Sequence, residues 1–287
     1  MQSSPPVHLS IVIVNWNTRE MLIDALRSIY DAPPSFTFET IVVDNASTDG
    51  SAEAVSAKFP QVHLIANRDN TGYAQGNNQG LEVSSGDIVL LLNPDVILPA
   101  GGLEKAAEIL ERDKRVAALG VKLVNPDGTH QASVRGFPTP IAVFWEATGL
   151  SRVFAKSRFF GAYRMTWFTY DHEAEVDQPM GTFLMIPRMA LTEIGLLDEK
   201  FTIFFNEVDW CYRAKQKGWK IIFSPEVEVV HYGGGSTRQV RAKMAWESRR
   251  GLLDFYRKHY RSPLYLPLIW LAATASWLQA FMASRKR

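Results

Sequence analysis

Residues Ile88 to Asp95, Ile-Val-Leu-Leu-Leu-Asn-Pro-Asp, decide the fold of this chain, because an apolar strand ends there abruptly at an acidic turn. The apolar run from Ile88 to Leu92 is typical of a strand buried on both faces of a mostly parallel sheet. Pro94 cannot continue the hydrogen-bond ladder, so Asp95 should lie at the carboxyl edge of the sheet, where open α/β sheets bind ligands. There Asp95 could hold Mg²⁺ and, through it, a diphosphate; alternatively, the turn merely caps a helix over 99–111.

Strands and helices alternate on both sides of this stretch. We expect strands over 9–15, 40–44 and 62–66, and helices over 19–30, from about 51, and over 73–83. Such alternation predicts an α/β fold with a doubly wound, mostly parallel sheet flanked by helices. The aromatic-rich stretch 137–170 has no clean period, so we expect loops and a mobile or substrate-facing insert there.

The composition excludes several classes of protein. The 287 residues are 46% apolar and 21% charged, which suits one large domain or two small ones. A formal net charge of +1 gives no reason to expect a nucleic-acid partner. The single cysteine, Cys211, excludes an intrachain disulfide and a Cys-based zinc site, and it fits a reducing compartment. The first residues lack a basic segment followed by an apolar core, so we expect no secretory signal and a cytoplasmic location.

The last 27 residues, 261–287, have a different character. Ser262 to Ser284 carry no charge, and basic residues bracket them at 261 and 285–287. The length is close to the roughly 20 residues that cross a bilayer, but two prolines and several polar residues interrupt the stretch. We expect an apolar helix lying in the membrane surface, with a spanning helix and a core or oligomer-interface helix as alternatives.

No glycine-rich phosphate loop follows the first strand. Val14 to Asn17, Val-Asn-Trp-Asn, stands where a dinucleotide-binding fold would carry G-x-G-x-x-G, which argues against a dehydrogenase and a nucleotidyltransferase. Amide and carboxylate side chains suited to a nucleobase and ribose follow the strands instead. They are Asn15, Asn17, Asp44, Asn45, Asn70, Asn77 and Asn93. Each of them alone could equally form an Asx turn or a helix cap.

Four segments together resemble glycosyltransferase family 2, and its rhamnosyltransferase-like branch is the most similar. The segments are LSIVIVNWN (9–17), IVVDNASTDGS (41–51), NTGYAQGNNQG (70–80) and LLLNPD (90–95). The resemblance extends from about Val7 to Arg257. It implies the GT-A fold, a nucleotide-sugar donor, a divalent cation (Mg²⁺ or Mn²⁺) and inversion at the anomeric carbon.

The resemblance also implies roles for the donor side. Asp44 would contact the nucleobase or ribose, and Asp95 would be the metal-binding last acid of the D-x-D motif. Asn93 replaces the first acid of that motif, which leaves one fewer negative charge. His231 could complete the metal site as a neutral imidazole, or be a surface or core histidine. Gly233 to Gly235 give hinge freedom, so the loop to Arg238 could close over the diphosphate, with Arg238 pairing with it.

The catalytic base is expected in the second half of the chain. Phe204 to Arg213, FFNEVDWCYR, resembles the E-D-V-D or E-E-V-D motif of the family at the start of a helix. Asn206 replaces the first acid, so deprotonation of the acceptor hydroxyl would fall on Glu207. The alternative makes Glu207 a first-turn acid favoured by the helix dipole. Asp209 is expected to cap the helix or to pair with Arg213 one turn on.

The sequence therefore predicts a GT-A domain over 1–260 and an apolar, membrane-associated segment over 261–287. Within the domain, 1–125 would bind the nucleotide-sugar and 126–260 would supply the acceptor site and catalysis. The predicted function is inverting, metal-dependent transfer of a sugar, with rhamnose a candidate, to a glycan or lipid-linked acceptor in cell-surface polysaccharide biosynthesis. The enzyme would be peripheral on the cytoplasmic face of the membrane. The alternatives are a non-catalytic sugar-nucleotide-binding protein and a membrane-tethered scaffold.

Overall fold

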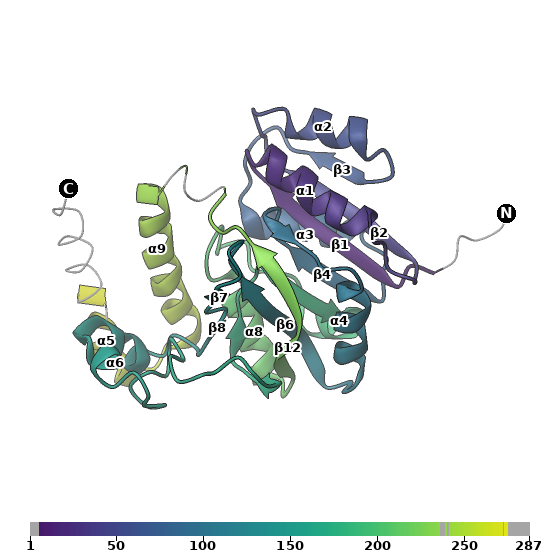
Figure 1. Cartoon of the computed structure of the whole chain (residues 1–287). Helices are drawn as coiled ribbons and strands as arrows, with labels where there is room; N and C mark the ends of the chain where they lie inside the picture. Colours follow the sequence, from purple (N-terminus) through teal and green to yellow (C-terminus); the bar gives the residue numbers. More distant parts are fainter. Residues whose placement is uncertain (1–5, 236–238, 240, 272, 275–287) are drawn as a thin grey trace.

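The computed structural model describes residues 6–235, 239, 241–271 and 273–274 (Figure 1). The strands are β1 (Leu9–Asn15), β2 (Phe38–Asp44), β3 (His63–Ala66), β4 (Ile88–Leu92), β5 (Val96–Ile97), β6 (Val116–Val124), β7 (His130–Gln131), β8 (Val134–Arg135), β9 (Ala174–Glu175), β10 (Gln178–Pro179), β11 (Phe183–Pro187) and β12 (Lys220–His231). The helices are α1 (Arg19–Tyr30), α2 (Ser51–Lys58), α3 (Tyr73–Val83), α4 (Gly102–Glu111), α5 (Pro140–Thr148), α6 (Leu150–Val153), α7 (Arg188–Ile194), α8 (Asn206–Gln216) and α9 (Arg241–His259).

A ten-stranded mixed sheet forms the centre of the molecule. Its order is β3-β2-β1-β4-β11-β6-β12-β5, with β7 paired to β6 and β9 paired to β12. The first four strands in this order are parallel, β11 runs antiparallel between β4 and β6, and β6 is parallel to β12. The prediction of a mostly parallel sheet flanked by helices is therefore confirmed.

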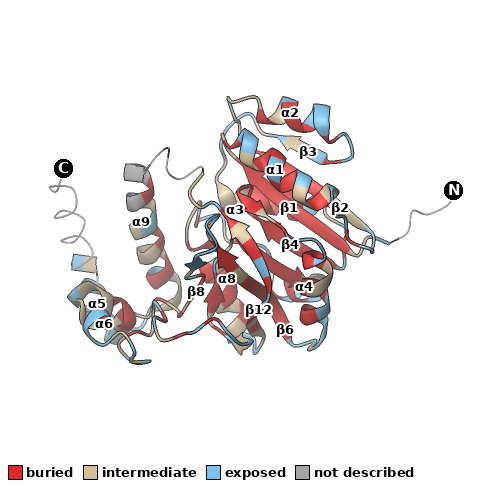
Figure 2. Ribbon diagram, in the orientation of Figure 1, coloured by how far each residue is buried: buried red, intermediate tan, exposed pale blue. Residues whose placement is uncertain are grey.

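Helices cover both faces of the sheet because its central strands are apolar on both sides (Figure 2). Along β1, residues 9, 11 and 13 pack into the cluster under α1, α2 and α4, whereas residues 12 and 14 pack into the cluster under α3, α7 and α8. This alternation is the period-2 geometry of a strand. Asn15, Asp44 and Asn93 consequently end neighbouring strands or follow them at one edge.

Helix α3 lies unusually close to β1, and its glycines explain the spacing of the NTGYAQGNNQG segment. Gly76 and Gly80 are one turn apart and both face β1. A Cβ atom on Gly80 would come within 2.4 Å of Val12 Cγ1, and one on Gly76 within 2.9 Å of Val14 Cγ1. The two glycines therefore allow α3 to pack directly on the strand that ends at the ligand edge.

The structure corrects three expectations about the elements. The helix expected over 99–111 begins at Gly102, whose N–H donates to the Pro99 carbonyl at 3.0 Å. The residues before His231 also predict a strand over 227–230, and this stretch is the end of the longer strand β12, which begins at Lys220. The expectation of loops over 137–170 is wrong in part, because the stretch contains α5 and α6. Its later aromatic residues pack into the core against Phe223, by contacts that create no sequence period.

A third cluster of buried residues joins distant parts of the second half. It contains Val143 of α5, Phe205 and Val208 around the start of α8, and Phe255 and Tyr256 of α9. A short 3₁₀ turn, Pro263–Tyr265, follows α9, and 266–271 are helical. Among the described residues no helix has the length and apolar character needed to cross a membrane. Residues 272 and 275–287 of the segment 261–287 lie outside the described residues.

Candidate active site

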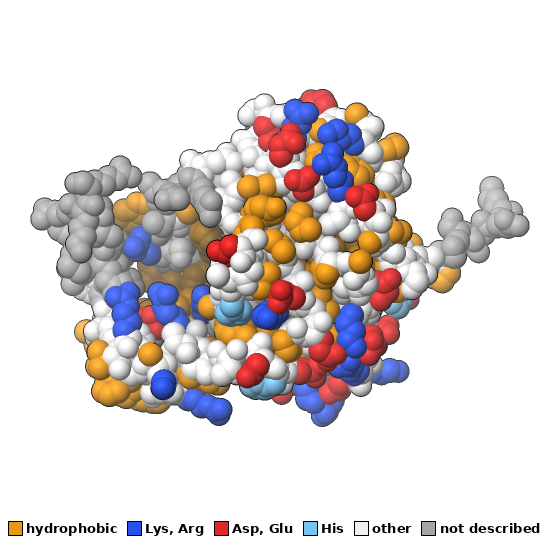
Figure 3. Space-filling view, viewed as in Figure 1, with side chains coloured by type: hydrophobic (Ala, Val, Ile, Leu, Met, Phe, Trp, Pro, Cys, Tyr) orange, Lys and Arg blue, Asp and Glu red, His pale blue; other side chains and the backbone are white. Residues whose placement is uncertain are grey.

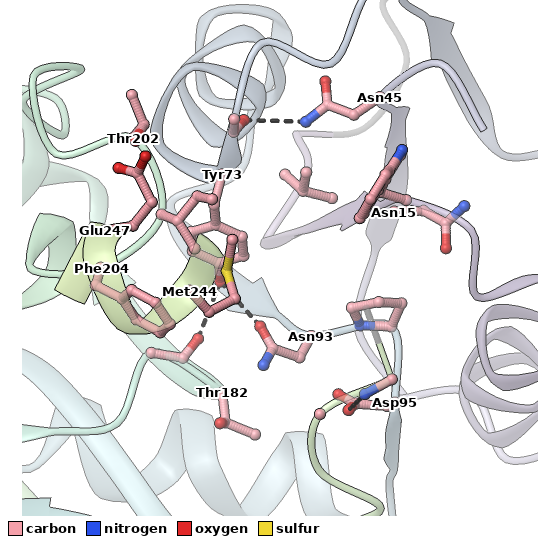
Figure 4. Close-up of a pocket in the computed structure, with 18 of the residues that line it drawn as sticks. Asn15, Asn45, Tyr73, Asn93, Asp95, Thr182, Thr202, Phe204, Met244 and Glu247 are labelled. Carbon is pink, nitrogen blue, oxygen red and sulfur yellow. Dashed lines mark hydrogen bonds between the residues drawn. The ribbon is translucent and has the colours of Figure 1, made fainter. Parts of the chain in front are cut away.

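A cavity of about 630 Å³ opens at the carboxyl edge of β1 and β4 (Figure 4). Asn15 and Asp95 lie on one side of it, and Phe204 and Glu247 lie on the other. The sequence-predicted residues that line it are Asn15, Asn45, Asn70, Asn93, Asp95, Glu207 and His231. Asn17, Asp44 and Asn77 do not line it. Arg238 lies outside the described residues.

Asp95 and His231 lie together at the edge of the cavity. Asp95 follows β4, His231 ends β12, and His231 Nε2 lies 3.4 Å from Asp95 Oδ1. Burial alone would raise the pKa of Asp95, but the contacts with His231 and the N–H of Gly235 outweigh it and lower the pKa. Asp95 is therefore a carboxylate at neutral pH.

The orientation of the His231 ring follows from Gln131. The side-chain N–H₂ of Gln131 donates to Asn125 Oδ1 and to the carbonyl of His231. Gln131 Oε1 is then the acceptor for His231 Nδ1–H at 2.8 Å. Nε2 consequently points toward Asp95: it donates a hydrogen bond to the carboxylate when the ring is protonated, and it offers a lone pair for a metal ion when the ring is neutral.

These two side chains fit a hard divalent cation only in part. Carboxylate and imidazole are both suitable ligands, and the hydrogen bond to Gln131 is the support that a ligating histidine usually has. The described residues nevertheless contain no group of three or more His, Cys, Asp or Glu that could enclose an ion. Asp95 and His231 could hold Mg²⁺ or Mn²⁺ only with further ligands from water or a bound diphosphate.

The side chain of Asn93 accepts a hydrogen bond from Tyr73. The Tyr73 hydroxyl lies 3.1 Å from Asn93 Oδ1 and 3.0 Å from the carbonyl oxygen of Gly181, and both are acceptors (Figure 4). Burial raises the pKa of Tyr73, so the hydroxyl keeps its proton and remains the donor. The Tyr73 hydroxyl thus connects α3 to the loop after β4 and to the segment before β11.

Asn15 and Asp44 form a closed network at the ends of β1 and β2. Asn15 Nδ2 donates to Asp44 Oδ1 at 2.8 Å and to Ser47 Oγ at 3.1 Å, and Asn15 Oδ1 accepts from Thr18. The backbone N–H of Ser47 donates to Asp44 Oδ2 at 2.9 Å. Both Asn15 and Asp44 are buried. In this conformation the Asp44 carboxylate organises the turn after β2.

The other predicted donor-side asparagines also hold turns and helix starts. Asn17 has φ 52°, its Oδ1 accepts from the Thr48 N–H at 2.8 Å, and its carbonyl accepts from Gln239. Asn70 Oδ1 accepts from the Gly72 N–H at 3.0 Å and lines the cavity. Asn77 is fully buried in α3, and its Oδ1 has no partner among the described residues.

Glu207 lies in the first turn of α8 and faces the cavity. The start of the helix is set by Phe205, whose φ of 71° is uncommon for a residue other than glycine. Phe205 packs closely on Gly251 of α9, where a Cβ atom would meet the ring at 2.8 Å. Burial raises the pKa of Glu207 to about 7, against the lowering effect of the backbone N–H groups of Glu207 and Val208. A carboxyl group with this pKa exchanges its proton readily at neutral pH.

Asp209 is a structural residue. Its buried carboxylate receives Arg213 Nε at 2.8 Å, Lys258 Nζ at 2.6 Å and His259 Nε2 at 2.7 Å. The predicted pairing with Arg213 is confirmed, and the two further partners join α8 to α9. Burial alone would raise the pKa of Asp209, but His259, Lys258 and Arg213 together lower it.

Sequence reasoning missed several cavity residues. Tyr73 lies inside the NTGYAQGNNQG segment. The sequence predicts donor contacts for the asparagines of this segment and none for its aromatic residue. Met244, Glu247 and Arg250 come from α9, an ordinary surface helix in sequence. Arg250 is the only Lys or Arg among the described residues that line the cavity.

A family comparison and a comparison with curated proteins agree with this arrangement. Residues 10–195 match the model of Glycosyl transferase family 2. An N-acetylglucosaminyl-diphospho-decaprenol L-rhamnosyltransferase of Mycobacterium tuberculosis is 27% identical over 239 residues, covering 78% of this chain and 77% of that protein. The low-salt glycan biosynthesis hexosyltransferase Agl10 of Haloferax volcanii is 26% identical, covering 78% of this chain and 66% of that protein.

Solved structures share the fold. The mannosyltransferase PcManGT from Pyrobaculum calidifontis, in complex with GDP-Man and Mn²⁺, superposes with a TM-score of 0.59 at 18% identity. The match covers 99% of this chain and 79% of that one. TarS of S. aureus superposes with a TM-score of 0.53 at 15% identity, over 89% of this chain and 44% of that one. The predicted GT-A fold is thereby confirmed.

Proposed function

We propose a specific reaction for this chain from the premise that it belongs to glycosyl transferase family 2 and is a glycosyltransferase. It moves a sugar from a nucleotide-sugar donor to a glycan or lipid-linked acceptor in cell-surface polysaccharide biosynthesis. Rhamnose is the favoured sugar, because the M. tuberculosis relative is named as an L-rhamnosyltransferase of a diphospho-decaprenol acceptor. The Haloferax relative, named for glycan biosynthesis, supports the same class of product.

The single observation that carries the mechanism is Glu207, a carboxyl group with a pKa of about 7 on the wall of the cavity. As a carboxylate it accepts the proton of the acceptor hydroxyl while that oxygen attacks the anomeric carbon. The bond to the nucleotide diphosphate breaks as the new bond forms on the opposite face, so the configuration inverts. Acceptance of the proton at Glu207 leaves a neutral carboxyl group in a poorly solvated position, which burial favours.

The donor is assigned to the first half of the chain, 1–125. Asn15, Asn70 and Asn93 offer amide groups along the cavity, and Asn45 does so beside them. Asn17, Asp44 and Asn77 do not line the cavity. We nevertheless assign to Asp44, which bonds to the cavity residue Asn15, the contact to the nucleobase or ribose. We also assign to Arg238 the pairing with the diphosphate.

Charge balance supports metal dependence. The described residues that line the cavity include Asp95, Glu207 and Glu247 but only one Lys or Arg. A nucleotide diphosphate would enter a site without a net positive charge. Mg²⁺ or Mn²⁺ bound at Asp95 and His231 would offset the charge of the diphosphate and of the leaving group. The protein residues orient that site through Gln131 and keep Asp95 ionised.

The acceptor is assigned to the second half, 126–260, with α9 as its outer wall. Phe204 and Met244 give this side apolar surface, and Glu247 gives it a polar group (Figure 4). Arg250 of α9 also lines the cavity. Work at the cytoplasmic face of a membrane is supported by the exposed Leu264, Leu266 and Trp270 in the segment after α9. At the membrane surface the enzyme would bind a lipid-linked acceptor.

Donor recognition can be tested directly. A panel of nucleotide-sugars is titrated calorimetrically into the protein with Mg²⁺, with Mn²⁺ and with excess chelator. We expect one donor to bind, and only with metal. Binding of no donor under any condition would contradict the proposed reaction.

A further inference from the structure

Exposed apolar side chains gather at one end of the molecule. Fourteen large hydrophobic residues are exposed in the described part of the chain, and eight of them lie in two short segments. One segment, in and after α6, carries Val153, Phe154 and Phe159, of which Val153 is 73% exposed. The other carries Leu264, Tyr265, Leu266, Trp270 and Leu271, with Leu264 85% exposed. We call these eight residues the apolar patch.

The two segments are far apart in sequence but belong to one packed unit. The buried cluster that contains Val143 of α5 and Phe255 of α9 also receives Ile269. The Tyr265 ring lies 5.1 Å from the Tyr260 ring at the end of α9. Figure 1 shows α5, α6 and the 3₁₀ turn together at the end of the molecule away from β3 and α2.

The two segments of the apolar patch and the residues beside them in sequence are rich in basic side chains. Residues 147–170 include four basic residues and no Asp or Glu, and residues after Asp254 include none to the end of the sequence. Arg152 and Lys156 are exposed and form no ion pair with any described residue. Arg158 lies over the Trp167 ring at 4.6 Å. Figure 3 shows basic side chains beside hydrophobic ones at this end.

We propose that the apolar patch, including the α6 segment, is the surface by which this protein docks on an anionic lipid bilayer. Apolar side chains rimmed by basic ones match the acyl region and the anionic headgroups of such a surface. A second copy of the chain fits less well. A two-fold interface would set the same basic border against itself.

Docking in this orientation would place the cavity beside the lipid. The buried cluster beneath the apolar patch includes Phe205 and Val208, the neighbours of Glu207. Helix α9 belongs to the same cluster and contributes Met244 and Glu247 to the cavity. Docking on the bilayer is inferred from the surface itself. Only its purpose, access to a lipid-linked acceptor, rests on the proposed function.

The test is sedimentation of the full-length protein with vesicles of phosphatidylcholine mixed with phosphatidylglycerol, or of phosphatidylcholine alone. Phe154→Ser/Phe159→Ser removes apolar surface from the α6 segment. Met189→Ser/Leu196→Ser is the matched control, because both residues are exposed apolar residues elsewhere. Arg152→Glu/Lys156→Glu reverses the border charge, and Lys58→Glu/Arg68→Glu is its control at the other end of the molecule.

We expect the wild type to bind the anionic vesicles and the phenylalanine variant to bind at least about tenfold more weakly. The charge variant should lose about fivefold or more per residue on anionic vesicles only. Both controls should bind like the wild type. All substituted side chains are exposed, so the melting temperatures should not change.

Wild-type binding by the phenylalanine variant would overturn the proposal. So would a wild type that ignores vesicles and forms a dimer that Phe154→Ser/Phe159→Ser dissociates, since the patch would then cover a second copy. Failure of the proposed function is separate. Glu207→Gln should bind vesicles normally, and the phenylalanine variant should keep its turnover with a water-soluble acceptor.

Discussion

Glu207 is the residue whose protonation should control the reaction. Its pKa is raised to about 7 by burial, so below pH 7 most of the enzyme carries a neutral carboxyl group that accepts no proton. We expect kcat/KM to rise with pH through about 7 and then to level off. A pH–rate profile of the wild type checks this. A profile that is flat between about pH 5.5 and 8 would exclude Glu207 as the base.

The raised pKa of Glu207 also makes the free energy of unfolding depend on pH. Between the ordinary pKa of Glu and about 7, the folded state binds more protons than the unfolded state at this position. The free energy of unfolding therefore falls as pH rises through that window. Glu207→Gln should raise the free energy of unfolding at pH 8 by about 1–3 kcal/mol relative to the wild type. Chemical denaturation at pH 5 and pH 8 measures the difference.

Asp95 is the residue on which the proposed metal dependence rests. Asp95→Ala should abolish the metal-dependent part of donor binding, because it would leave His231 as the single protein ligand proposed for the metal. Asp87→Ala is a control, since Asp87 is an exposed acid at the opposite end of β4. Calorimetric titration of the donor with and without Mn²⁺ measures the effect. Unchanged donor affinity in Asp95→Ala would remove the metal from the mechanism.

At the scale of elements, Asp209 joins α8 to α9 and so helps to position Glu207, the proposed base, relative to the α9 wall of the cavity. Its lowered pKa means that its contribution to stability is present above the ordinary pKa of Asp and is lost as pH falls below it. Asp209→Asn should lower the free energy of unfolding at pH 7 by about 2–4 kcal/mol. Turnover per folded molecule should change much less than in Glu207→Gln.

Denaturant unfolding and turnover of the purified folded fraction separate these effects. Asp24→Asn is the matched control, because Asp24 pairs with Arg27 on the exposed surface of α1 and should cost less than about 1 kcal/mol. A folded Asp209→Asn enzyme that is as inactive as Glu207→Gln would mean that the base was assigned to the wrong acid.

Most elements of the first half could be predicted from sequence because their signals are local. The apolar alternation of β1, the amphipathic face of α1 and the stop at Pro94 each depend on neighbours in the chain. The short strands β7 to β10 have two residues each. Strand β7 pairs with β6 across the turn 125–129, whereas β8, β9 and β10 exist through pairing with strands that are distant in sequence. The same is true of the aromatic packing against Phe223, so no local period revealed it.

At the scale of the whole molecule, the candidate site is only partly visible in the sequence. Strand ends indicate Asn15, Asn93 and Asp95, since parallel strands bring their carboxyl ends together. The contact of Tyr73 with Asn93 joins elements that fold together in three dimensions, and nothing local to either residue predicts it. The α9 wall of the cavity depends on the packing of α5, α8 and α9 in one cluster.

Because of that packing, the cavity lies between the edge of the sheet on one side and the unit of α8 and α9 on the other. In the proposed mechanism, the sheet edge with Asp95 and the amide groups binds the donor, and the unit of α8 and α9 provides Glu207 and the acceptor wall. Catalysis by the proposed mechanism requires both sides, whereas donor binding requires only the first. Glu207→Gln therefore separates the two activities in one protein.

The most direct measurement is sugar transfer by the wild type and Glu207→Gln, with the bound donor and a soluble acceptor, followed by NMR of the product. We expect a product whose anomeric configuration is opposite to that of the donor. Turnover should be lower by about 10²–10⁴-fold in Glu207→Gln, with donor affinity nearly unchanged. A product with retained configuration, or a Glu207→Gln enzyme that transfers sugar at the wild-type rate, would contradict the proposed mechanism.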